Sequence, residues 1–285
     1  MLDSPLVRKL VSLALEEDEA HADLTAALTV PESHRSTAKL IARQPLVACG
    51  LPIAAVIVRE AGFQLAVTVA VAEGEEVDDG AALVELEGPT RQILAVERTM
   101  LNFLQRMCGV ATYTRKFVSA AAGLTILDTR KTMPGWRLLD KYSTRVGGAS
   151  NHRMSLADMI LVKNNHIDAH PGGIRAALQS VHDSKPAGIR WEVEVRTLEE
   201  LSVALEFNPD IVMLDNFTDS DVKLAMQAIS GATVRPMVEV SGGVRADRLA
   251  VLRNLGVDAV SAGSLTTQAP NVDISLRIRG ALRES

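Results

Sequence analysis

The chain contains little of what marks several classes of protein. Only 2 of its 285 residues are cysteine, which excludes a disulfide-linked scaffold, and we expect Cys49 and Cys108 to be buried thiols in a reducing compartment. Aromatic residues make up 3%, so the core must be built from aliphatic side chains. The formal net charge of -5 argues against a general nucleic-acid-binding protein, because such proteins usually present a basic face.

Long hydrophobic runs are also missing. The apolar stretch at residues 46–58 is too short to span a bilayer, and it contains Pro52. Residues 2–17 have the pattern of an amphipathic helix rather than that of a signal peptide. We therefore expect a cytoplasmic protein.

The first part of the chain has the pattern of a mixed α/β module. Between residues 36 and 88, short apolar runs alternate with Gly, Asp and Glu, which is typical of short strands. A helix is predicted over residues 51–62 and a long helix over 90–121, broken near Gly109. The pattern changes near residues 110–120, which predicts a domain boundary there.

The second part repeats a strand-then-helix pattern. The strand-like runs are residues 124–129, 159–163, 190–195, 210–215, 236–241 and 257–263. Clear helical patterns cover residues 198–207, 219–230 and 246–256. Such repetition predicts parallel strands buried on both faces, as in a barrel or a doubly wound sheet.

The ends of these strands favour the barrel. Nearly every run ends in, or is directly followed by, a residue that can do chemistry or allow close backbone approach. These residues are Asp128 with Arg130, Lys163, Glu194, Asp215, Ser241 and Gly263. Strands also end at polar residues because the chain leaves the core there, but in a (β/α) barrel the C-terminal strand ends meet at one mouth, where active sites lie.

Positive charge is concentrated in one short segment of this acidic chain. Residues 128–153 contain the basic side chains of Arg130, Lys131, Arg137, Lys141, Arg145 and Arg153, with His152 beside them. Lys163 ends an apolar strand, where a lysine is costly unless it meets an anion. A solvated basic face is the ordinary alternative. Because guanidinium groups suit carboxylates and phosphates, we predict a pocket for a small molecule with several negative charges.

Carboxylates are predicted at the same mouth. Glu194 and Asp215 end neighbouring strands, where they could hold Mg²⁺ or sugar hydroxyls. The alternative is that they only form ion pairs with Arg130 and Lys163. We expect Glu192 to face the helix layer or solvent instead.

Glycines follow the last two strands. Ser241, Gly242 and Gly243 precede a predicted helix, and Gly263 with Ser264 repeats the arrangement one unit later. Backbone N–H groups at such junctions can bind a phosphate, and barrels often place a phosphate site after their final strands. Plain turns are the alternative.

Several motifs together resemble the quinolinate phosphoribosyltransferase family. They are ERTMLNFLQRMCGVAT (97–112), DTRKTMPGWRLLDKY (128–142), VGGASNHR (146–153), MILVKNNHI (159–167), EVEV (192–195), LDNF (214–217), SGG (241–243) and DISL (273–276). The resemblance implies an N-terminal α/β sandwich over residues 1–115 and an incomplete α/β barrel over residues 116–285, whose C-terminal end could pack back on the first domain. It also implies a homodimer that forms nicotinate mononucleotide, pyrophosphate and CO₂ from quinolinate and phosphoribosyl pyrophosphate, with Mg²⁺.

The resemblance also implies roles for single residues. Arg130, His152, Arg153 and Lys163 would bind quinolinate, together with Arg98 from the partner subunit. Lys131 and Lys163 would face the pyrophosphate, and Glu194 and Asp215 would hold the ribose hydroxyls and the metal. Ser241, Gly242, Gly243, Gly263 and Ser264 would bind the 5′-phosphate. Catalysis would rest on Lys131, Lys163, Glu194 and Asp215.

Departures from the family pattern leave alternatives open. Asn164 stands where an acidic residue is common, and Thr267 where histidine is common. A related phosphoribosyltransferase with another anionic acceptor would fit these differences. From the residues alone, a barrel lyase with Lys163 as a Schiff base, or an inactive binding subunit, are further alternatives.

Overall fold

The computed structural model describes residues 1–281 and divides into two compact units. Unit 1 comprises Met1–Arg115, Thr132–Gly148 and the C-terminal segment from Leu265, and unit 2 comprises Lys116–Lys131 and Ala149–Ser264. The predicted boundary at residue 115 coincides with the end of the first segment. Residues 132–148 also belong to unit 1, which the sequence did not predict. The C-terminal strand, at the end of the chain that was expected to be able to pack back on the first domain, belongs to unit 1 as well.

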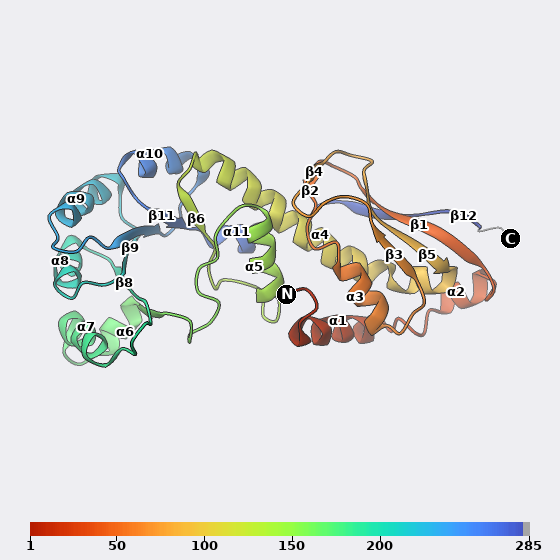
Figure 1. Ribbon diagram of the computed structural model, residues 1–285, viewed down its shortest axis with the longest axis horizontal. Helices are drawn as coiled ribbons and strands as arrows, with labels where there is room; N and C mark the ends of the chain where they lie inside the picture. Colours follow the sequence, from red (N-terminus) through yellow and green to blue (C-terminus); the bar gives the residue numbers. More distant parts are fainter. Residues whose placement is uncertain (282–285) are drawn as a thin grey trace. The chain divides into compact units, whose positions relative to one another are not determined.

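Unit 1 is built on an antiparallel sheet with the strand order β12-β1-β5-β3 (Figure 1). Its strands are β1 (Arg35–Ala42), β3 (Ala66–Val69), β5 (Ala82–Pro89) and β12 (Ile274–Ala281), and β2 (Leu46–Val47) pairs with β4 (Glu76–Val77). Alternate residues of β1 are buried, among them Ala38 and Leu40, as expected for a sheet with one face on the core. The C-terminal strand belongs to unit 1 because β12 pairs with β1 along its length.

Helices complete unit 1. They are α1 (Pro5–Glu17), α2 (Leu24–Thr29), α3 (Ile53–Glu60), most of α4 (Thr90–Ala121), α5 (Arg137–Val146) and most of α11 (Ser264–Thr267). The side chain of Ser4 accepts a hydrogen bond from the backbone N–H of Val7, and Pro5 follows it, so α1 begins where capping chemistry predicts. The predicted helices at residues 2–17 and 51–62 are confirmed.

The predicted break of the long helix at Gly109 is wrong, because α4 is continuous from Thr90 to Ala121. A Cβ atom at Gly109 would lie 2.2 Å from the carbonyl oxygen of Pro270. The glycine therefore allows another backbone segment of unit 1 to approach the helix closely, and it does not end the helix.

The two cysteines lie together in the core of unit 1, although they are distant in the sequence. The backbone N–H of Cys49 donates to the Sγ of Cys108 over 3.3 Å, and both are buried free thiols. Burial raises the pKa of Cys108 to about 12 and also raises that of Cys49. The prediction of buried thiols is confirmed.

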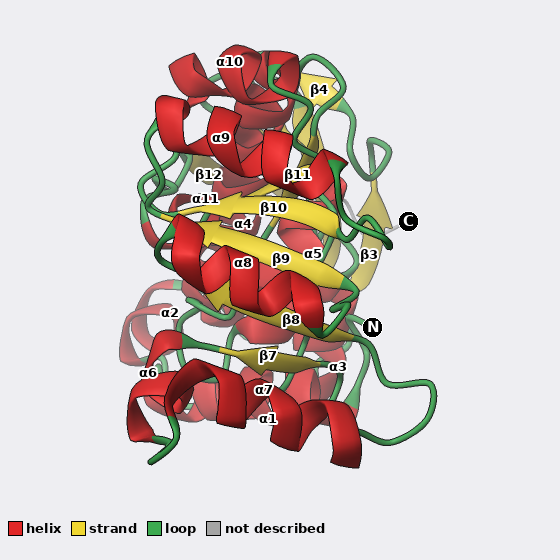
Figure 2. Cartoon of the chain, turned by 90° about the vertical axis from the view of Figure 1, so that its left-hand side faces the viewer, coloured by secondary structure: helices red, strands yellow, loops and turns green. Residues whose placement is uncertain are grey.

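Unit 2 is a six-stranded sheet with the order β6-β11-β10-β9-β8-β7, in which all neighbours are parallel. The strands are β6 (Thr125–Leu127), β7 (Ile160–Val162), β8 (Trp191–Val195), β9 (Ile211–Asp215), β10 (Met237–Ser241) and β11 (Ala259–Ser261). The helices are α6 (Asn164–Ala169), α7 (Gly173–Ser184), α8 (Leu198–Glu206), α9 (Asp219–Ser230), the 3₁₀ helix η1 (Ala246–Arg248) and α10 (Leu249–Asn254). Figure 2 shows α8 and α9 side by side over strands β8 to β10. The six predicted strands are confirmed.

The sheet of unit 2 is an open barrel because β6 and β7, although consecutive in the chain, do not pair. Between them, residues 132–148 belong to unit 1, and the chain re-enters unit 2 at Ala149. Within the part of the chain that the structure describes, one isolated bridge outside the named strands joins β6 to the returning chain, between Leu127 and Ser150. We call the region between β6 and β7 the open side of the sheet.

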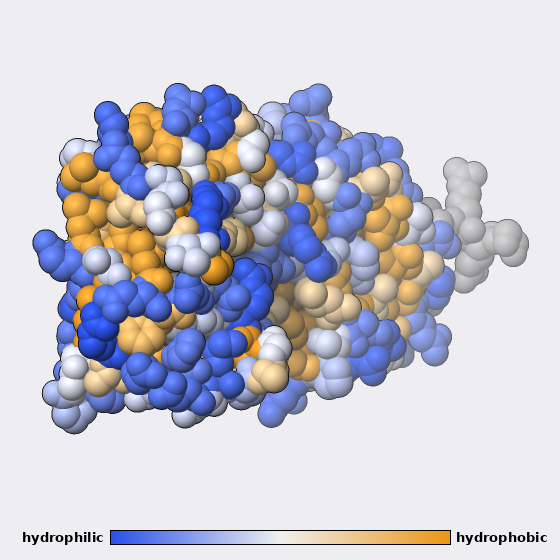
Figure 3. Space-filling view, turned by 60° about the vertical axis from the view of Figure 1, so that its left-hand side comes forward, coloured by the Kyte–Doolittle hydropathy of each residue, from blue (hydrophilic) through white to orange (hydrophobic). Residues whose placement is uncertain are grey.

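The outer surface is mixed in polarity. Hydrophilic side chains and hydrophobic areas alternate on the face shown in Figure 3, and the exposed apolar residues of unit 2 include Leu224 and Val251. Scattered apolar side chains of this kind are ordinary on protein surfaces. Within residues 1–281, no helix combines the length and hydropathy needed to cross a membrane.

The Gly109→Ala substitution tests the close approach to α4. We expect it to lower the free energy of unfolding by about 1–3 kcal/mol, because the overlap with Pro270 outweighs the better helix propensity of alanine. Gly231→Ala is the matched control, since its Cβ would meet only the carbonyl oxygen of Ala228 at 3.6 Å. Equal stability of the two variants in urea denaturation would contradict this explanation.

Candidate functional site

A cavity of about 600 Å³ lies at the C-terminal ends of the strands of unit 2. Its lining consists of Thr129, Arg130, Lys131, His152, Arg153, Leu161, Lys163, Glu194, Met213, Asp215, Asn216, Ser241, Gly242, Gly243 and Ser261. The strand ends therefore converge as the (β/α) pattern predicts. Most residues that the sequence singled out meet here.

Two arginines form a positively charged wall of the cavity. The pKa of Arg153 is lowered by burial and by the neighbouring positive charge of Arg130. The Nε of Arg130 is buried and has no hydrogen-bond partner within the described part of the chain. One NH of Arg153 donates to the carbonyl oxygen of Met159 over 3.1 Å, which leaves further donors of its guanidinium group. The wall thus brings two positive charges close together in the cavity lining.

Two lysines lie on other sides of the cavity. The aliphatic part of Lys131 lies against Gly263, where a Cβ atom would come within 2.8 Å of the Lys131 Cδ. The Nζ of Lys163 is 3.9 Å from a carboxylate oxygen of Glu194, and the Lys163 side chain is 45% exposed. An ion pair that is this long and exposed contributes about 1 kcal/mol at most, so Lys163 can change partners when an anion binds.

The two predicted carboxylates both line the cavity. Glu194 also accepts a long backbone hydrogen bond of 3.4 Å from Asn164 at the start of α6. Asp215 accepts a hydrogen bond of 3.0 Å from the side chain of Asn216. Both residues end neighbouring strands, β8 and β9, and offer the oxygen ligands that Mg²⁺ prefers.

The glycine loop after β10 is shaped by Asn216. Asn216 has a φ of 58°, and its backbone N–H donates to the carbonyl oxygen of Ser241 over 3.0 Å. Gly242 has a φ of 93°, and a Cβ atom there would lie 2.1 Å from the Asn216 Oδ1. The loop that is predicted to bind phosphate is therefore fitted directly against the residue that follows Asp215.

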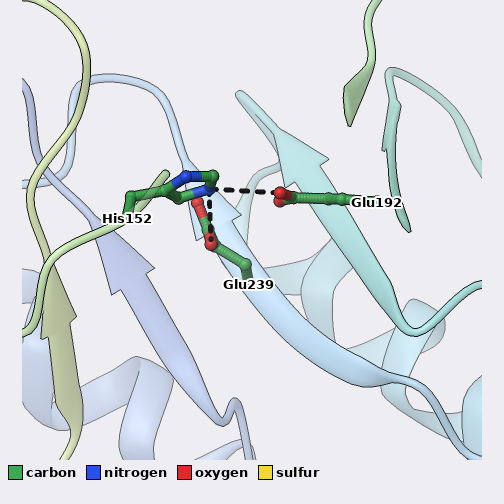
Figure 4. A group of neighbouring side chains, drawn as sticks. All are labelled: His152, Glu192 and Glu239. Carbon is green, nitrogen blue, oxygen red and sulfur yellow. Dashed lines mark ion pairs between the residues drawn. The ribbon is translucent and has the colours of Figure 1, made fainter. Parts of the chain in front are cut away.

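The loop that carries His152 is fixed by buried carboxylates. Asp128 accepts hydrogen bonds from the side chain of Asn151 (2.6 Å) and from the backbone N–H of His152 (2.8 Å). The His152 Nε2 lies 3.1 Å from an oxygen of Glu192 and 3.6 Å from one of Glu239 (Figure 4). These three residues form a group that could in principle also bind a metal ion.

The prediction that Glu192 faces the helix layer or solvent is wrong. Residues two apart on a strand point to the same side, so Glu192 lies on the side of Glu194, deeper in the sheet, and it is fully buried. Glu239 stands in the same relation to Ser241, and the sequence interpretation missed it. Burial, followed by the charge of Glu192, raises the pKa of Glu239 to about 7. The sequence did contain a signal for this pair, because Glu192 and Glu239 each lie inside an otherwise apolar strand.

Some predicted residues lie outside the cavity lining. Arg98 is exposed on α4 in unit 1. Gly263 contacts Lys131 but does not line the cavity, and Ser264 begins α11. Conversely, the lining includes residues that the sequence did not single out, namely Thr129, Leu161, Met213, Asn216 and Ser261. Of these, Asn216 is the most informative, because its backbone conformation favours glycine and is tolerated by asparagine.

Comparisons with known proteins give one family. The family models named "Quinolinate phosphoribosyl transferase" match with their N-terminal domain over residues 23–108 and their C-terminal domain over residues 110–277. The chain is 36% identical to quinolinate phosphoribosyltransferase [decarboxylating] 2, mitochondrial, of Nicotiana glauca, over 95% of this chain and 82% of the relative. It is also 36% identical to nicotinate-nucleotide pyrophosphorylase [carboxylating] of Mycobacterium leprae, over 94% and 96%.

Solved structures agree with this family. The nicotinate-nucleotide pyrophosphorylase from Francisella tularensis superimposes with a TM-score of 0.87 at 36% identity, covering 96% of each chain. The corresponding protein from Ehrlichia chaffeensis gives a TM-score of 0.88 at 31% identity, covering 95% of this chain and 98% of that one. The sandwich and open barrel predicted from the sequence are therefore confirmed.

The two glycines after Ser241 provide a matched test of the phosphate loop. We expect Gly242→Ala to weaken binding of ribose 5-phosphate by at least roughly tenfold more than Gly243→Ala. Both positions have positive φ and share that strain, but a Cβ at Gly243 would meet nothing within 4 Å. Titration calorimetry measures both affinities, and equal losses would show that Asn216 does not constrain the loop.

Proposed function

The chain belongs to the quinolinate phosphoribosyltransferase family, and we propose that it is a carboxylating nicotinate-nucleotide pyrophosphorylase. It would convert quinolinate and phosphoribosyl pyrophosphate to nicotinate mononucleotide, pyrophosphate and CO₂, a step of NAD biosynthesis. The observation that carries the proposal is the pair Arg130 and Arg153, whose positive charges act on each other in the lining of the cavity that also holds the glycine loop.

The arginine pair suits a pyridine dicarboxylate. Two adjacent guanidinium groups repel each other until a dianion enters, and each can donate paired hydrogen bonds to one carboxylate. The buried Nε of Arg130 would then gain the partner that it lacks. Binding of quinolinate therefore removes a cost that the empty cavity carries.

The remaining groups suit the phosphoribosyl substrate. The backbone N–H groups of Gly242 and Gly243 would receive the 5′-phosphate, while Glu194 and Asp215 would accept hydrogen bonds from the ribose hydroxyls. Lys131 and Lys163 would meet the pyrophosphate, and Lys163 would leave its weak pair with Glu194 to do so.

The reaction follows from this arrangement. As the bond from the ribose C1 to pyrophosphate breaks, positive charge develops at C1, and the carboxylates of Glu194 and Asp215 stabilise it. The pyridine nitrogen then forms a bond to C1 and becomes positively charged. The 2-carboxylate leaves as CO₂, the ring accepts the electron pair, and a proton takes its place. The protein holds the reactants and supplies charge.

Magnesium fits the oxygen ligands of this site. Glu194 and Asp215 would hold Mg²⁺, directly or through water, in the cavity that Lys131 and Lys163 also line. When bound, the ion would offset the charge of the pyrophosphate leaving group.

We also propose a homodimer in which Arg98 serves the partner's cavity. Arg98 is exposed, and it forms no ion pair or hydrogen bond within residues 1–281, so its charge is available to another chain.

The free thiols of Cys49 and Cys108 support a cytoplasmic location, because reducing compartments preserve free thiols.

A Schiff-base lyase is the weaker candidate. Lysines that form Schiff bases usually lie in desolvated pockets, whereas Lys163 is 45% exposed and faces a carboxylate. The departure at Asn164 motivates a second candidate, a phosphoribosyltransferase with another anionic acceptor, and the substrate assay below separates it from the proposed enzyme.

The first test is a product assay. The purified protein is incubated with Mg²⁺, phosphoribosyl pyrophosphate and either quinolinate or nicotinate, and the products are identified by mass spectrometry. We expect nicotinate mononucleotide and CO₂ from quinolinate alone. Turnover of a different acid would transfer the proposal to another acceptor, and borohydride trapping of a substrate on Lys163 would favour the lyase.

Subunit mixing tests the shared site. We expect Arg98→Ala and Arg153→Ala to lose most activity separately, and their mixture to recover about a quarter of the unsubstituted activity, since random exchange makes half the dimers hybrids with one intact site each. Mixing Arg98→Ala with Arg98→Ala carrying a different tag is the control for exchange. Failure to recover activity after confirmed exchange would disprove the role of Arg98 in the partner.

A further inference from the structure

A buried polar group lies beneath the cavity and is not used by the proposed reaction. Glu192 of β8 and Glu239 of β10 are fully buried, and the His152 side chain between them is 8% exposed (Figure 4). None of the four oxygens of Glu192 and Glu239 has a hydrogen bond of good geometry within residues 1–281. Two buried carboxylates are costly in a sheet interior, so their presence requires a reason.

The hydrogen bonds of His152 determine where its ring proton lies. The backbone N–H of Arg153 donates to the His152 Nδ1 over 2.7 Å, so Nδ1 is an acceptor and carries no proton. The proton of the neutral ring is therefore on Nε2, the nitrogen that lies 3.1 Å from an oxygen of Glu192 and 3.6 Å from one of Glu239. A metal ion on Nε2 would have to displace this proton. A ligand in the cavity would meet a ring whose Nδ1 already accepts from Arg153 and whose Nε2 already lies beside the two glutamates.

Contacts with several strands hold the loop that carries His152. It lies at the open side of the sheet, where an isolated bridge joins Ser150 to Leu127 of β6. Asp128 fixes the loop from β6, while the ring of His152 ties it to β8 and β10. Arg153 follows directly, and its backbone N–H is itself bonded to that ring. The placement of Arg153 thus depends on the placement of His152.

We propose that Glu192 and Glu239 are positioning residues, which hold His152 as an Nε2–H donor and thereby fix the Arg153 loop for the carboxylate of the acid substrate. The pair supplies, at the open side, the anchorage that a paired strand would supply in a closed barrel. The identity of that acid as quinolinate rests on the proposed function.

The tautomer of His152 gives the most direct test. In protein labelled with ¹⁵N-histidine, long-range ¹H–¹⁵N spectra distinguish a protonated Nε2 from a protonated Nδ1, and His152→Asn assigns the signals. We expect a single Nε2–H tautomer in the unaltered protein, and a mixture of tautomers in Glu239→Gln and Glu192→Gln. A ring protonated on Nδ1 in the unaltered protein would overturn the proposal.

Kinetics test the consequence for the substrate. We expect Glu239→Gln to raise the KM for quinolinate by roughly tenfold, as for loss of a charged hydrogen-bond acceptor, and to change the KM for phosphoribosyl pyrophosphate less than about twofold. Val240→Ala is the matched control, because this residue is also fully buried on β10 but points to the other side of the strand. A selective rise in the quinolinate KM of the control, or equal rises for both substrates in Glu239→Gln, would contradict the proposal.

A double-mutant cycle shows whether the glutamates act through His152. If they do, Glu239→Gln adds little to the quinolinate KM once His152→Asn is present, whereas independent effects would multiply. The competing explanation is that His152, Glu192 and Glu239 bind a metal ion, and metal analysis of the purified protein tests it. Stoichiometric Zn²⁺ or Mn²⁺ that is lost in His152→Asn would contradict the hydrogen-bond role. Absence of any turnover with quinolinate would refute the proposed function, while the tautomer measurement would still test the histidine–glutamate contact.

Discussion

The repulsion between Arg130 and Arg153 is the constraint on which the site depends. The two guanidinium groups repel each other, and the Nε of Arg130 is buried with no hydrogen-bond partner in the part of the chain that the structure describes. The charges of Glu192 and Asp158 act on Arg153 in the opposite direction. Arg130 follows β6 directly, but Arg153 lies on a loop that no strand continues, so side chains must hold the loop: Asp128 on one side and the His152 contacts on the other. Under the proposed function, a bound dianion would offset the repulsion between the two groups.

At the glycine loop, too, a few side-chain and backbone contacts hold the segment in place. Asn216 continues β9 with a positive φ, donates to Asp215 through its side chain and bonds to the backbone of Ser241, so one residue links Asp215 to the glycine loop. Gly242 is required because any side chain there would overlap Asn216. Under the proposed function, this link would set the positions of the sugar and phosphate groups relative to each other, which is how positioning contributes to catalysis.

The sequence predicted the features that follow from periodicity and from strand ends. Lys163, Glu194, Asp215 and Ser241 could be found because each closes an apolar run, and parallel strands bring such ends together. What failed depended on tertiary context. Gly109 resembled a helix break but serves close packing against Pro270, and the grouping of residues 132–148 with unit 1 has no local pattern. Glu192 was misplaced although the two-residue period, applied from Glu194, puts both on one face. The role of Glu239 could not be predicted, because its neighbour His152 comes from a loop that is distant in the sequence.

The departure at Asn164 is consistent with the charge balance of the cavity. Its backbone N–H points at Glu194, which also pairs with Lys163, so an acidic side chain at this position would bring a second negative charge close to that pair. The neutral amide leaves Lys163 with one weak partner. Lysine then retains the ability to turn toward an anionic ligand, and the carboxylate of Glu194 retains its lone pairs for a sugar hydroxyl or a cation. The neutral side chain of Asn164 therefore adds no negative charge beside Lys163 and Glu194.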